Sequence, residues 1–583
     1  MSSPHPDVMH LQRVRLPRWL LGDAWPTADA QPTLADIHLT DHGTIHRIVP
    51  HGSTVPATEH APGATWDLQG ALALPGLVDA HTHLDKAFTL PRMGEVRPGL
   101  LGAIDAMMAD RQGWTEADVR TRASRALEWA WRHGVRHLRT HCDWWEPAQP
   151  PLAWHVLREL AETWAPRLRV ERVSLIPLHL YTRREDAMAL AATVARAGPG
   201  ALLGGFVHST NWDPAALQNL LEAAATHDLD VDLHVDEELH PDAQGLATTA
   251  GLLRRMDFGG RVVCGHTCAL AVQDEATALA TLDAVAQAPI TMVTLPITNL
   301  LLQDAVTGRT PRQRGLTLIK EARARGIPLL MASDNVQDPF CAVGSFDPLE
   351  AFGTGVLAAQ LGQPFDHWSD TLCRTDWLTR QPSATGQAPL QPGQPADLLL
   401  FTEADYWGFP SRTAHRVVLR QGRLTHGALP PPATASGIAQ PLARYAAWRR
   451  AGDWVLLSGV IAVDPTAGTI VRGYADIPAD AADRIGRTGE FSSDIKEGPV
   501  LAQSWYVLDR IRQTVEAAGG QMSDVVKLVQ YFKNLDHFPL YSRVRRQFFP
   551  GDPPASTVVE VSGMLPTADI LIEVEATAYL PMK

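Results

Sequence analysis

The sequence predicts an α/β protein built around an eight-stranded (β/α)8 barrel, the TIM barrel, followed by a smaller α+β domain. Three observations lead to this prediction. Short apolar runs alternate with helical stretches between residues 74 and 384, as strands and helices do in such a barrel. Polar residues follow directly after several of these runs, where barrel enzymes carry their active sites. A proline-rich linker at 427–441 then separates residues 442–583, which are long enough for a domain of their own.

Length and composition limit the possible functions. The chain has 583 residues, more than one core usually holds, so we expect two or more domains. Its net charge of -13 and the lack of a basic tract argue against a nucleic-acid partner. No apolar run is long enough to cross a bilayer, no signal peptide is evident, and the five unpatterned cysteines fit a reducing compartment. We therefore expect a cytoplasmic protein with a small-molecule substrate and no membrane or nucleic-acid partner.

Both ends of the barrel region have strand character. Before residue 73, short strand-like runs are broken by turn signals such as Asp41-His-Gly43. Strand-like runs return at 393–401 and 416–422. We expect residues 1–73 and 385–426 to form one small β-sandwich domain from both sides of the barrel at 74–384.

The barrel strands are expected where apolar runs precede polar residues. One unit shows the alternation well: Thr115-Glu-Ala-Asp118 is a capping box that opens a helix through Trp131, and Gly134 stands at the C-cap position. The eight predicted strands centre on 74–78, 135–139, 168–176, 202–207, 231–235, 261–265, 290–295 and 328–332.

Histidines and a carboxylate stand at the predicted strand ends. His81 and His83 follow the first strand one residue apart, so their side chains point the same way. His234, His266 and Asp334 follow the fifth, sixth and eighth strands. Imidazole nitrogens and a carboxylate oxygen suit one divalent metal such as Zn2+ or Fe2+. Each residue alone also fits a structural role, for example a helix cap for Asp334, but their common position predicts a metal site.

A metal at this place predicts hydrolysis, because a bound divalent ion makes hydroxide available near neutral pH. Glu237 lies three residues past His234 and can carry a proton from the attacking water to a leaving nitrogen. Asp334 can take the first proton of the water. His266 can polarise the substrate or a tetrahedral oxyanion. The predicted catalytic residues are therefore Glu237, His266 and Asp334.

Five motifs occur in a fixed order along this region: Pro75-Gly-Leu-Val-Asp-Ala-His81-Thr-His83-Leu-Asp-Lys86, Arg139-Thr-His-Cys-Asp143, His234-Val-Asp-Glu237, Gly265-His266-Thr267 and Ala332-Ser-Asp334-Asn335. With them, residues 11–426 resemble the amidohydrolase superfamily, specifically its cytosine deaminase-like branch. The resemblance implies one metal per subunit, Zn2+ or Fe2+, bound by His81, His83, His234 and Asp334. It also implies Glu237 as a proton shuttle and His266 as the residue that faces water and substrate.

The chain departs from cytosine deaminases in the residues that hold the ring. Their third strand ends in Pro-Gln, whereas this chain has Pro177-Leu178, and leucine cannot bind a pyrimidine carbonyl. Asn335 replaces a second aspartate, and with Lys86 it looks more like N-isopropylammelide isopropylamidohydrolase. We expect C–N hydrolysis in an N-heterocycle or amidine-like compound other than cytosine. The alternative is release of an alkylamine or opening of a ring. The candidate substrate-binding residues are Leu178, Asn335, Trp144, Phe340 and Lys86, with Trp145 as a further aromatic wall.

The C-terminal region alternates strands and helices in an α+β order. Strands are predicted at 454–459, 524–531, 556–561 and 570–579, and helices at 502–518 and 538–549. Motifs such as Ser458-Gly459, Pro554-Ala-Ser-Thr-Val-Val-Glu560 and Ile572-Glu573-Val-Glu575 resemble the RidA family of enamine/imine deaminases, which has a chorismate mutase-like fold. The resemblance implies a trimer, or trimers paired into a hexamer.

The RidA-like site is incomplete by the family's pattern. Tyr445 and Glu573 fall on positions that active members use for substrate and water. The arginine that binds the substrate carboxylate should stand at Ser556, and a hydroxyl cannot replace a bidentate guanidinium. The segment 479–499, with Arg484 and Arg487, looks like an insertion that can supply another cation. The domain either hydrolyses an imine or enamine product of the barrel, or serves as a non-catalytic trimerisation or sensing module.

Overall fold

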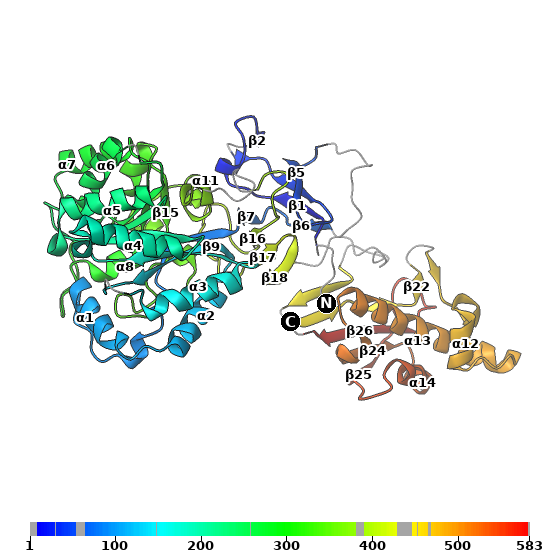
Figure 1. The fold of residues 1–583 in the computed structure, drawn as a ribbon. Helices are drawn as coiled ribbons and strands as arrows, with labels where there is room; N and C mark the ends of the chain where they lie inside the picture. Colours follow the sequence, from blue (N-terminus) through cyan, green and yellow to red (C-terminus); the bar gives the residue numbers. More distant parts are fainter. Residues whose placement is uncertain are drawn as a thin grey trace. The chain divides into compact units, whose positions relative to one another are not determined.

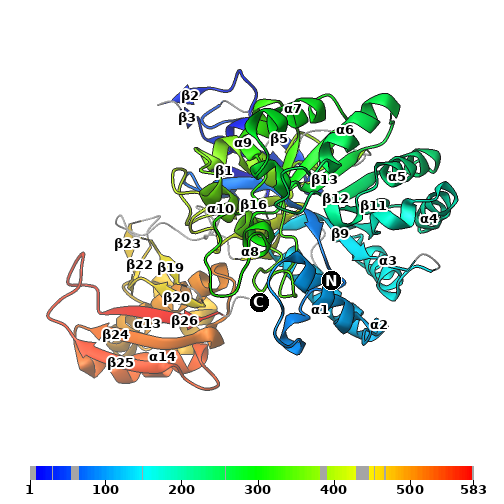
Figure 2. The same ribbon diagram turned by 90° about the vertical axis from the view of Figure 1, so that its left-hand side faces the viewer.

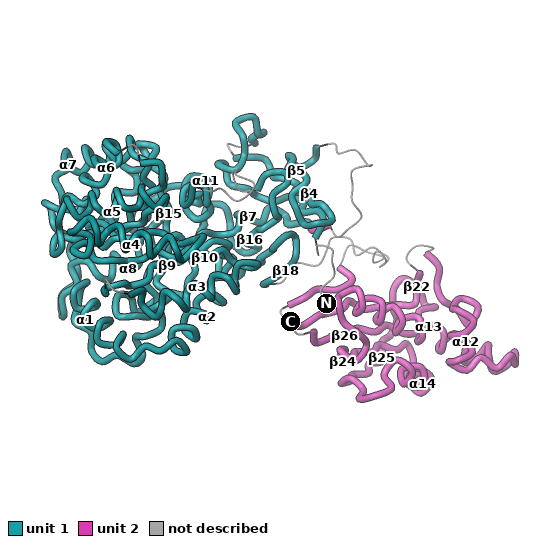
Figure 3. Tube along the Cα trace, viewed as in Figure 1, with its two compact units in different colours: residues 1–63, 67–427 teal, residues 64–66, 428–583 magenta. Residues whose placement is uncertain are grey.

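The structure is a computed structural model that describes residues 8–28, 31–53, 65–146, 149–256, 258–380, 390–427, 446–451, 453–464 and 468–580. The chain forms two compact units, residues 1–63 with 67–427 and residues 64–66 with 428–583 (Figure 3). The predicted linker at 427–441 lies outside the described residues except for Gly427. The domain boundaries predicted within the first unit stay predictions.

The first unit contains the predicted (β/α)8 barrel. Eight strands form one parallel sheet whose spatial order follows the chain, and helices surround it (Figures 1 and 2). The strands are β8 (Leu77–Thr82), β9 (Val135–Asp143), β10 (Arg169–Leu175), β11 (Ala201–Val207), β12 (Val231–Val235), β13 (Val262–His266), β14 (Ile290–Thr294) and β15 (Leu329–Met331). The helices are α1 (Leu100–Arg111), α2 (Glu116–Arg132), α3 (Leu152–Trp164), α4 (Arg184–Arg196), α5 (Pro214–Thr226), α6 (Gly245–Met256), α7 (Glu275–Val285), α8 (Pro296–Leu302), α9 (Ile319–Ala324), α10 (Pro348–Ala358) and α11 (Pro364–His367).

The first and last strands approach each other at the active-site end of the barrel. The Asp334 N–H donates to the carbonyl oxygen of His81 at 2.8 Å, and a parallel bridge joins Thr82 to Asp334. The sheet is therefore nearly closed. The same contact places a residue that follows β15 next to the histidines of β8.

The first barrel strand differs from its prediction. The apolar run expected as one strand at 74–78 is divided: β7 (Leu72–Pro75) pairs with another sheet, and β8 begins at Leu77. Proline has no backbone N–H to continue a ladder, and Gly76 connects the two strands. His81 is consequently inside β8 rather than beyond its end. The capping box at Thr115 is confirmed, since its side chain accepts from the Asp118 N–H at 3.2 Å and α2 follows.

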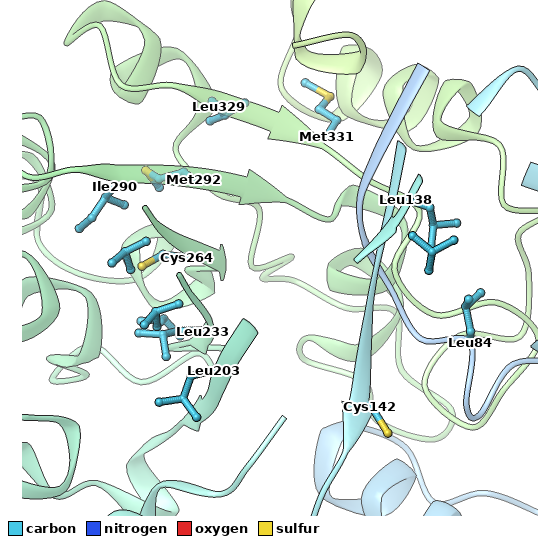
Figure 4. Packing of buried hydrophobic residues seen from close by; sticks show 14 of the residues in the cluster. Leu84, Leu138, Cys142, Leu203, Leu233, Cys264, Ile290, Met292, Leu329 and Met331 are labelled. Atoms are coloured by element: carbon cyan, nitrogen blue, oxygen red, sulfur yellow. The ribbon is translucent and has the colours of Figure 1, made fainter. Parts of the chain in front are cut away.

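Apolar side chains of the strands hold the barrel to its helices. Leu203, Leu233, Cys264, Met292 and Leu329 come from five consecutive strands and lie in one buried cluster (Figure 4). Alternation along a strand then turns the intervening residues to the other side of the sheet. In β12, Leu233 belongs to this cluster, so Asp232 and His234 face away from the helices.

Smaller antiparallel sheets accompany the barrel in the first unit. In one, β7 pairs with β16 (Leu398–Phe401), which pairs with β17 (Val417–Arg420), and this strand with β18 (Arg423–His426). Another contains β1 (His10–Val14), β4 (Ala35–Leu39) and β5 (Ile45–Pro50). In that sheet β6 (Thr65–Asp67) lies beside β1, and the remaining short strands β2 (Thr27–Ala28) and β3 (Gln31–Pro32) pair with each other. Residues from before and after the barrel thus pair in the sheet that contains β7 and β16.

The second unit has the α+β content that the sequence predicts. Its strands are β19 (Trp448–Ala451), β20 (Trp454–Leu457), β21 (Val460–Ile461), β22 (Val463–Asp464), β23 (Thr469–Ile470), β24 (Val525–Phe532), β25 (Ala555–Glu560) and β26 (Ile572–Tyr579). Its helices are α12 (Ala479–Ile485), α13 (Phe491–Ala517) and α14 (Phe538–Phe548). Helix α13 begins eleven residues before the predicted 502 and includes Pro499. Across the described ranges of both units, no helix combines the length and apolar character needed to cross a bilayer.

Candidate active site

Four side chains predicted as metal ligands meet at one end of the barrel. His234 Nε2 lies 3.1 Å from His81 Nε2 and 3.2 Å from His83 Nε2. Asp334 Oδ1 lies 3.3 Å from His83 Nε2 and 3.6 Å from His81 Nε2. Ligand atoms at tetrahedral corners, about 2.0–2.2 Å from a metal, are separated by about 3.3–3.6 Å. The four distances are close to this separation, and His81, His83 and Asp334 form one group that could hold a metal ion.

The electrostatics of the four side chains also fit a cation. All four are buried, and neither oxygen of Asp334 has a hydrogen-bond partner within the described part of the chain. Burial lowers the pKa of His81, His83 and His234 well below the usual range, so the imidazoles are neutral and can donate lone pairs. Burial, with Asp338 nearby, raises the pKa of Asp334 to about 8. A buried carboxyl without a partner is costly, and a divalent metal removes that cost.

The backbone around the ligands is shaped for this arrangement. His266 and Asp334 adopt φ angles of 68° and 61° at the ends of their strands, a left-handed conformation that non-glycine residues rarely take and that clusters at functional sites. Gly265 leaves room for a ligand, because a Cβ there would lie 3.0 Å from the Cε1 and Nδ1 atoms of His81.

The two predicted acid–base residues lie side by side. His266 Nδ1 is 3.4 Å from Glu237 Oε1 and 3.1 Å from Asn299 Oδ1. Since both neighbours accept hydrogen bonds, Nδ1 carries the proton and Nε2 has a free lone pair. Burial lowers the pKa of His266 to about 3. Burial, together with the Asp334 carboxylate, raises the pKa of Glu237 well above its usual range, so Glu237 can hold a proton near neutral pH.

The loop that presents Glu237 is fixed by its neighbour. The Asp236 carboxylate accepts from the Gly245 N–H at 3.0 Å and the Leu246 N–H at 2.9 Å, at the start of α6. Gln303 donates to the carbonyl oxygen of Glu237 at 3.3 Å. These contacts hold the carboxyl of Glu237 beside His266.

A cavity lies over the predicted metal ligands, with about 440 Å³ of empty space that includes open solvent. His83, His234, Glu237 and His266 line it on the reacting side. Its apolar walls come from barrel strands, from the segments that follow them and from α1, and consist of Leu100, Ile104, Met107, Trp145, Leu175, Pro177, Phe206 and Phe340. The remaining polar residues that line it are Lys86, Asp143 and Asn335. Flat apolar walls with few polar groups suit an aromatic heterocycle.

Lys86 is a buried cation with fixed partners. Its Nζ lies 3.2 Å and 3.1 Å from the two oxygens of Asp143 and 4.3 Å from the centre of the Phe340 ring. Burial opposes the charge, but the carboxylates of Asp143, Asp85 and Asp338 outweigh it and raise the pKa of Lys86. Lys86 therefore stays charged in the cavity wall.

The structure separates the predicted substrate-binding residues into two groups. Lys86, Asn335 and Phe340 line the cavity. Leu178 and Trp144 do not, because both are buried in the apolar cluster between strands and helices. The Trp144 N–H bonds to the Leu175 carbonyl oxygen at 2.9 Å, continuing the pairing of β9 with β10. Alternation then turns Trp144 into the core and Trp145 into the cavity. A substrate-binding role for Leu178 and Trp144 stays a prediction, and neither lines this cavity.

Two further candidate residues, His141 and Asp143, were not assigned a role from the sequence. Asp143 lines the cavity, and His141 comes close enough to His81 and His234 to form a second potential metal-binding group. His141 and Asp143 repeat the spacing of His81 and His83 on the next strand, which is the signal that identifies them. Below them, Arg139 connects Asp232 and Glu171 by charged hydrogen bonds of 2.7–3.0 Å.

In the second unit, the RidA-like residues stand on different strands. Glu573 is on β26, and burial raises its pKa. Ser556 is on β25, where its hydroxyl accepts from Arg545 at 3.1 Å and donates to Gln530 Oε1 at 2.9 Å. Tyr445 lies outside the described residues. Arg484 and Arg487 of the 479–499 segment pair with Asp480 and Asp483 on or beside α12.

Comparison with known proteins gives two families, one for each region. The model described as "Amidohydrolase family" matches residues 112–426, and the model described as "Endoribonuclease L-PSP" matches residues 437–580. A protein named "Pterin deaminase" from Rhizobium rhizogenes is 39% identical over 402 residues, which cover 68% of this chain and 89% of the relative. A "RutC family protein" from Pyrococcus horikoshii is 34% identical over 140 residues, 24% of this chain and 90% of the relative.

A solved structure shares the fold of the first unit. The 5-methylcytosine deaminase from Klebsiella pneumoniae superposes with a TM-score of 0.59 and 24% identity, and the match covers 72% of this chain and 98% of that one. At this level of identity the similarity concerns the fold, and it confirms the barrel with its accompanying β-strands.

Proposed function

We propose that this chain, which belongs to the amidohydrolase family and ends in a domain of the RutC family, deaminates a pterin ring by hydrolysis. It is a hydrolase that acts on C–N bonds of N-heterocycles. The observation that carries the proposal is the meeting of the metal-ligand cluster, Glu237 and His266 in one cavity with flat apolar walls. A pterin is a fused two-ring system with one exocyclic amino group beside a ring carbonyl, and 39% identity to a pterin deaminase supports this ring.

The metal belongs to the family's chemistry, and we propose that His81, His83, His234 and Asp334 hold it as Zn2+ or Fe2+. Three nitrogen donors and one oxygen donor suit either ion. When bound, a divalent cation at these ligands lowers the pKa of water and makes a nucleophile available near neutral pH.

The proton transfers are assigned to three residues of this chain. Asp334 takes the first proton of the attacking water. Glu237 delivers its proton to the adjacent ring nitrogen. It then carries the hydroxyl proton of the tetrahedral intermediate to the departing amino group, and the proton on Asp334 restores protonated Glu237. His266, with its free Nε2, accepts a hydrogen bond from the attacking water and orients it. Water adds at the carbon that carries the amino group, and the C–N bond breaks. The products are a ring carbonyl and ammonia, so atoms and charge balance.

The ring is held by the opposite part of the cavity. We propose that Phe206, Trp145 and Phe340 enclose the ring faces and that Lys86 and Asn335 bind its carbonyl oxygen and ring nitrogens. The cationic Nζ of Lys86 has a donor left for such an oxygen after pairing with Asp143. Cytosine lacks the second ring and leaves most of these walls unused.

An assay with three rings tests the substrate. Pterin, cytosine and N-isopropylammelide are incubated with the metal-loaded protein, and ammonia and product mass are measured. The proposal expects ammonia from pterin and a product one mass unit heavier. Release of an alkylamine from the triazine, with no change to pterin, contradicts it and favours the alternative reaction.

We further propose that the second unit assembles the chain into a trimer. One sheet face carries exposed apolar side chains: Trp454 is 48% exposed, Leu456 49% and Tyr579 40%. The rings of Trp454 and Tyr579 lie 5.1 Å apart on neighbouring strands. Such a continuous apolar patch is typical of an interface. Light scattering of a Trp454→Glu/Leu456→Glu variant should give the mass of one chain, whereas Leu357→Glu, at an 81% exposed residue of the first unit, should leave the oligomer intact. Equal masses for both variants would contradict the assignment.

A further inference from the structure

A second cavity adjoins the active-site cavity on one side of α1. Asp143 lines both cavities. Along α1, Met107 lines the active site and the next residue, Met108, lines the second cavity. The second cavity also includes Arg111 at the end of α1, Trp114 before α2 and Leu152 at the start of α3. The second cavity therefore lies next to the active-site cavity, on its Asp143 side.

The sheet order shows which end of the substrate reaches this space. Asp143 ends β9 and His266 ends β13, four strands further along an eight-stranded barrel. The two residues are thus on opposite sides of the barrel mouth. Glu237, two residues past β12, is on the side of His266. A ring whose amino group lies beside Glu237 and His266 extends toward Asp143, so a substituent far from the amino group enters the second cavity.

Arg111 determines the chemistry of the second cavity. Its side chain is only 13% exposed, and it is the one lysine or arginine among the described residues that line this space. Its Nη1 and Nη2 donate to the two oxygens of Glu146 at 3.0 Å and 2.8 Å. Glu146 is 57% exposed, so solvent can replace the guanidinium around its carboxylate. A carboxylate already occupies the fork of Arg111 in two-point geometry, the mode that guanidinium groups favour.

The cavity at the other end of α1 has the opposite character. It shares Leu100 and Glu237 with the active site, and Glu238, His208 and His240 line it, with no lysine or arginine among its described lining residues. Glu238 is held there by the Ser209 N–H at 2.7 Å. An anionic group would face Glu237 and Glu238 in this space. Of these two spaces, only the one with Arg111 has a lysine or arginine among its described lining residues, and its carboxylates Asp143 and Glu146 are already paired with Lys86 and Arg111.

We propose that the substrate carries a carboxylate on the ring end opposite its amino group, and that Arg111 binds this carboxylate in place of Glu146. The proposal rests on the deamination of a fused N-heterocycle argued above. Arg111 is then a specificity-determining residue that acts far from the reacting carbon. Glu146 is its internal competitor, and the substrate displaces Glu146 into solvent.

The test compares two rings in four proteins. Pterin and pterin with a carboxylate on the second ring are assayed for kcat/KM with the wild-type chain, Arg111→Gln, Glu146→Gln and Arg120→Gln. Arg120 is the matched control, an exposed helix arginine paired with Glu159. Loss of a charged two-point contact should lower the carboxylated-to-plain ratio about 10- to 100-fold in Arg111→Gln. Glu146→Gln should raise this ratio, and Arg120→Gln should keep the wild-type ratio.

Two results would overturn the proposal. One is an unchanged ratio in Arg111→Gln, and the other is a lower ratio in Glu146→Gln. If neither ring releases ammonia, the proposed function fails, and calorimetric binding of the same two rings then decides the subsite. Preferential binding of the carboxylated ring that Arg111→Gln abolishes would support the role of Arg111, and equal binding of both rings would refute it.

Discussion

Replacement of Arg139 by methionine tests the buried charge network beneath the metal ligands. Arg139 is fully buried and donates to Asp232 Oδ2 at 2.8 Å, to Glu171 Oε2 at 2.7 Å and 3.0 Å, and to the Leu378 carbonyl oxygen at 2.8 Å. Methionine fills much of the same volume without the charge. Glu171 keeps Arg169 as a partner at 2.6 Å. Asp232 keeps only His141 Nε2, 3.1 Å away, among the described residues.

The expected loss of unfolding free energy follows from the Asp232 carboxylate, which loses the Arg139 cation. Removal of one partner from a buried ion pair costs about 3–5 kcal/mol, because an uncompensated charge stays in the interior. Removal of both charges costs less, since no charge is then left unpaired. We therefore expect Arg139→Met to lower the free energy of unfolding by about 3–5 kcal/mol. In Arg139→Met/Asp232→Asn, we expect part of that loss to be recovered.

The variant should also change the response to acid. Charges on His137 and Arg139 outweigh the effect of burial and hold the pKa of Glu171 well below its usual range. A depressed carboxyl pKa stabilises the fold above the unfolded pKa of about 4.3 and loses this effect as the pH falls through the folded value. Without Arg139 the folded pKa of Glu171 rises. The acid-side loss of stability should therefore begin at a higher pH than in the wild-type chain.

Urea unfolding followed by tryptophan fluorescence measures both the loss of stability and its pH dependence. Each appears as a change in the urea concentration at the unfolding midpoint, while the dependence of the unfolding free energy on urea stays constant. Arg120→Met is the control, since its exposed pair with Glu159 should contribute at most about 1 kcal/mol. A cost below about 1 kcal/mol for Arg139→Met, or a double variant less stable than the single one, would refute the reasoning about the network.

Three further predictions concern the metal site and the reaction. Glu237→Gln should keep the metal and lower kcat about 10²- to 10⁴-fold, because it removes the proton carrier; full activity in steady-state assays would rule out that role. Gly265→Ala should weaken metal affinity about tenfold or more, since its Cβ would press on the His81 ring at 3.0 Å; Gly251→Ala in α6 is the control, and chelator competition gives both affinities. Removal of the metal should lower the melting temperature, since free metal at 1,000 times Kd contributes about 4 kcal/mol; identical melting curves with and without chelator would contradict the ligand assignment.

Most of the barrel could be predicted from the sequence because its strands are short apolar runs that polar residues terminate. The strand at 231–235 was predicted with its observed bounds, since Val231, Leu233 and Val235 are apolar and His234 follows the alternation. The first strand could not be placed correctly, because the run from Leu72 to Val78 looks continuous. Pairing partners from another sheet, which the sequence does not reveal, divide it at Gly76.

The close approach of the four predicted ligand residues could be foreseen for the same reason, whereas the cavity walls could not. Strand ends locate His81, His234 and Asp334 without knowledge of the loops. Trp144 and Trp145 are neighbours at the end of a strand, so a one-residue error in the predicted alternation places the wrong tryptophan in the cavity. The hydrogen bond from the Trp144 N–H to the Leu175 carbonyl oxygen, which the sequence does not reveal, shows that Trp145 enters the cavity. The sequence also did not predict that α1 forms part of the cavity wall. Leu100, Ile104 and Met107 have the spacing of a buried helix face, but the pattern does not say which surface they cover.

The measurement that tests the central claim most directly is metal analysis combined with ammonia release, for the wild-type chain and for a His81→Ala/His83→Ala variant. The account predicts about one equivalent of zinc or iron per wild-type chain, ammonia release from a pterin, and loss of both in the variant. Ammonia release that persists in a variant without metal would contradict a metal-dependent deaminase. So would a wild-type protein that binds no metal after reconstitution.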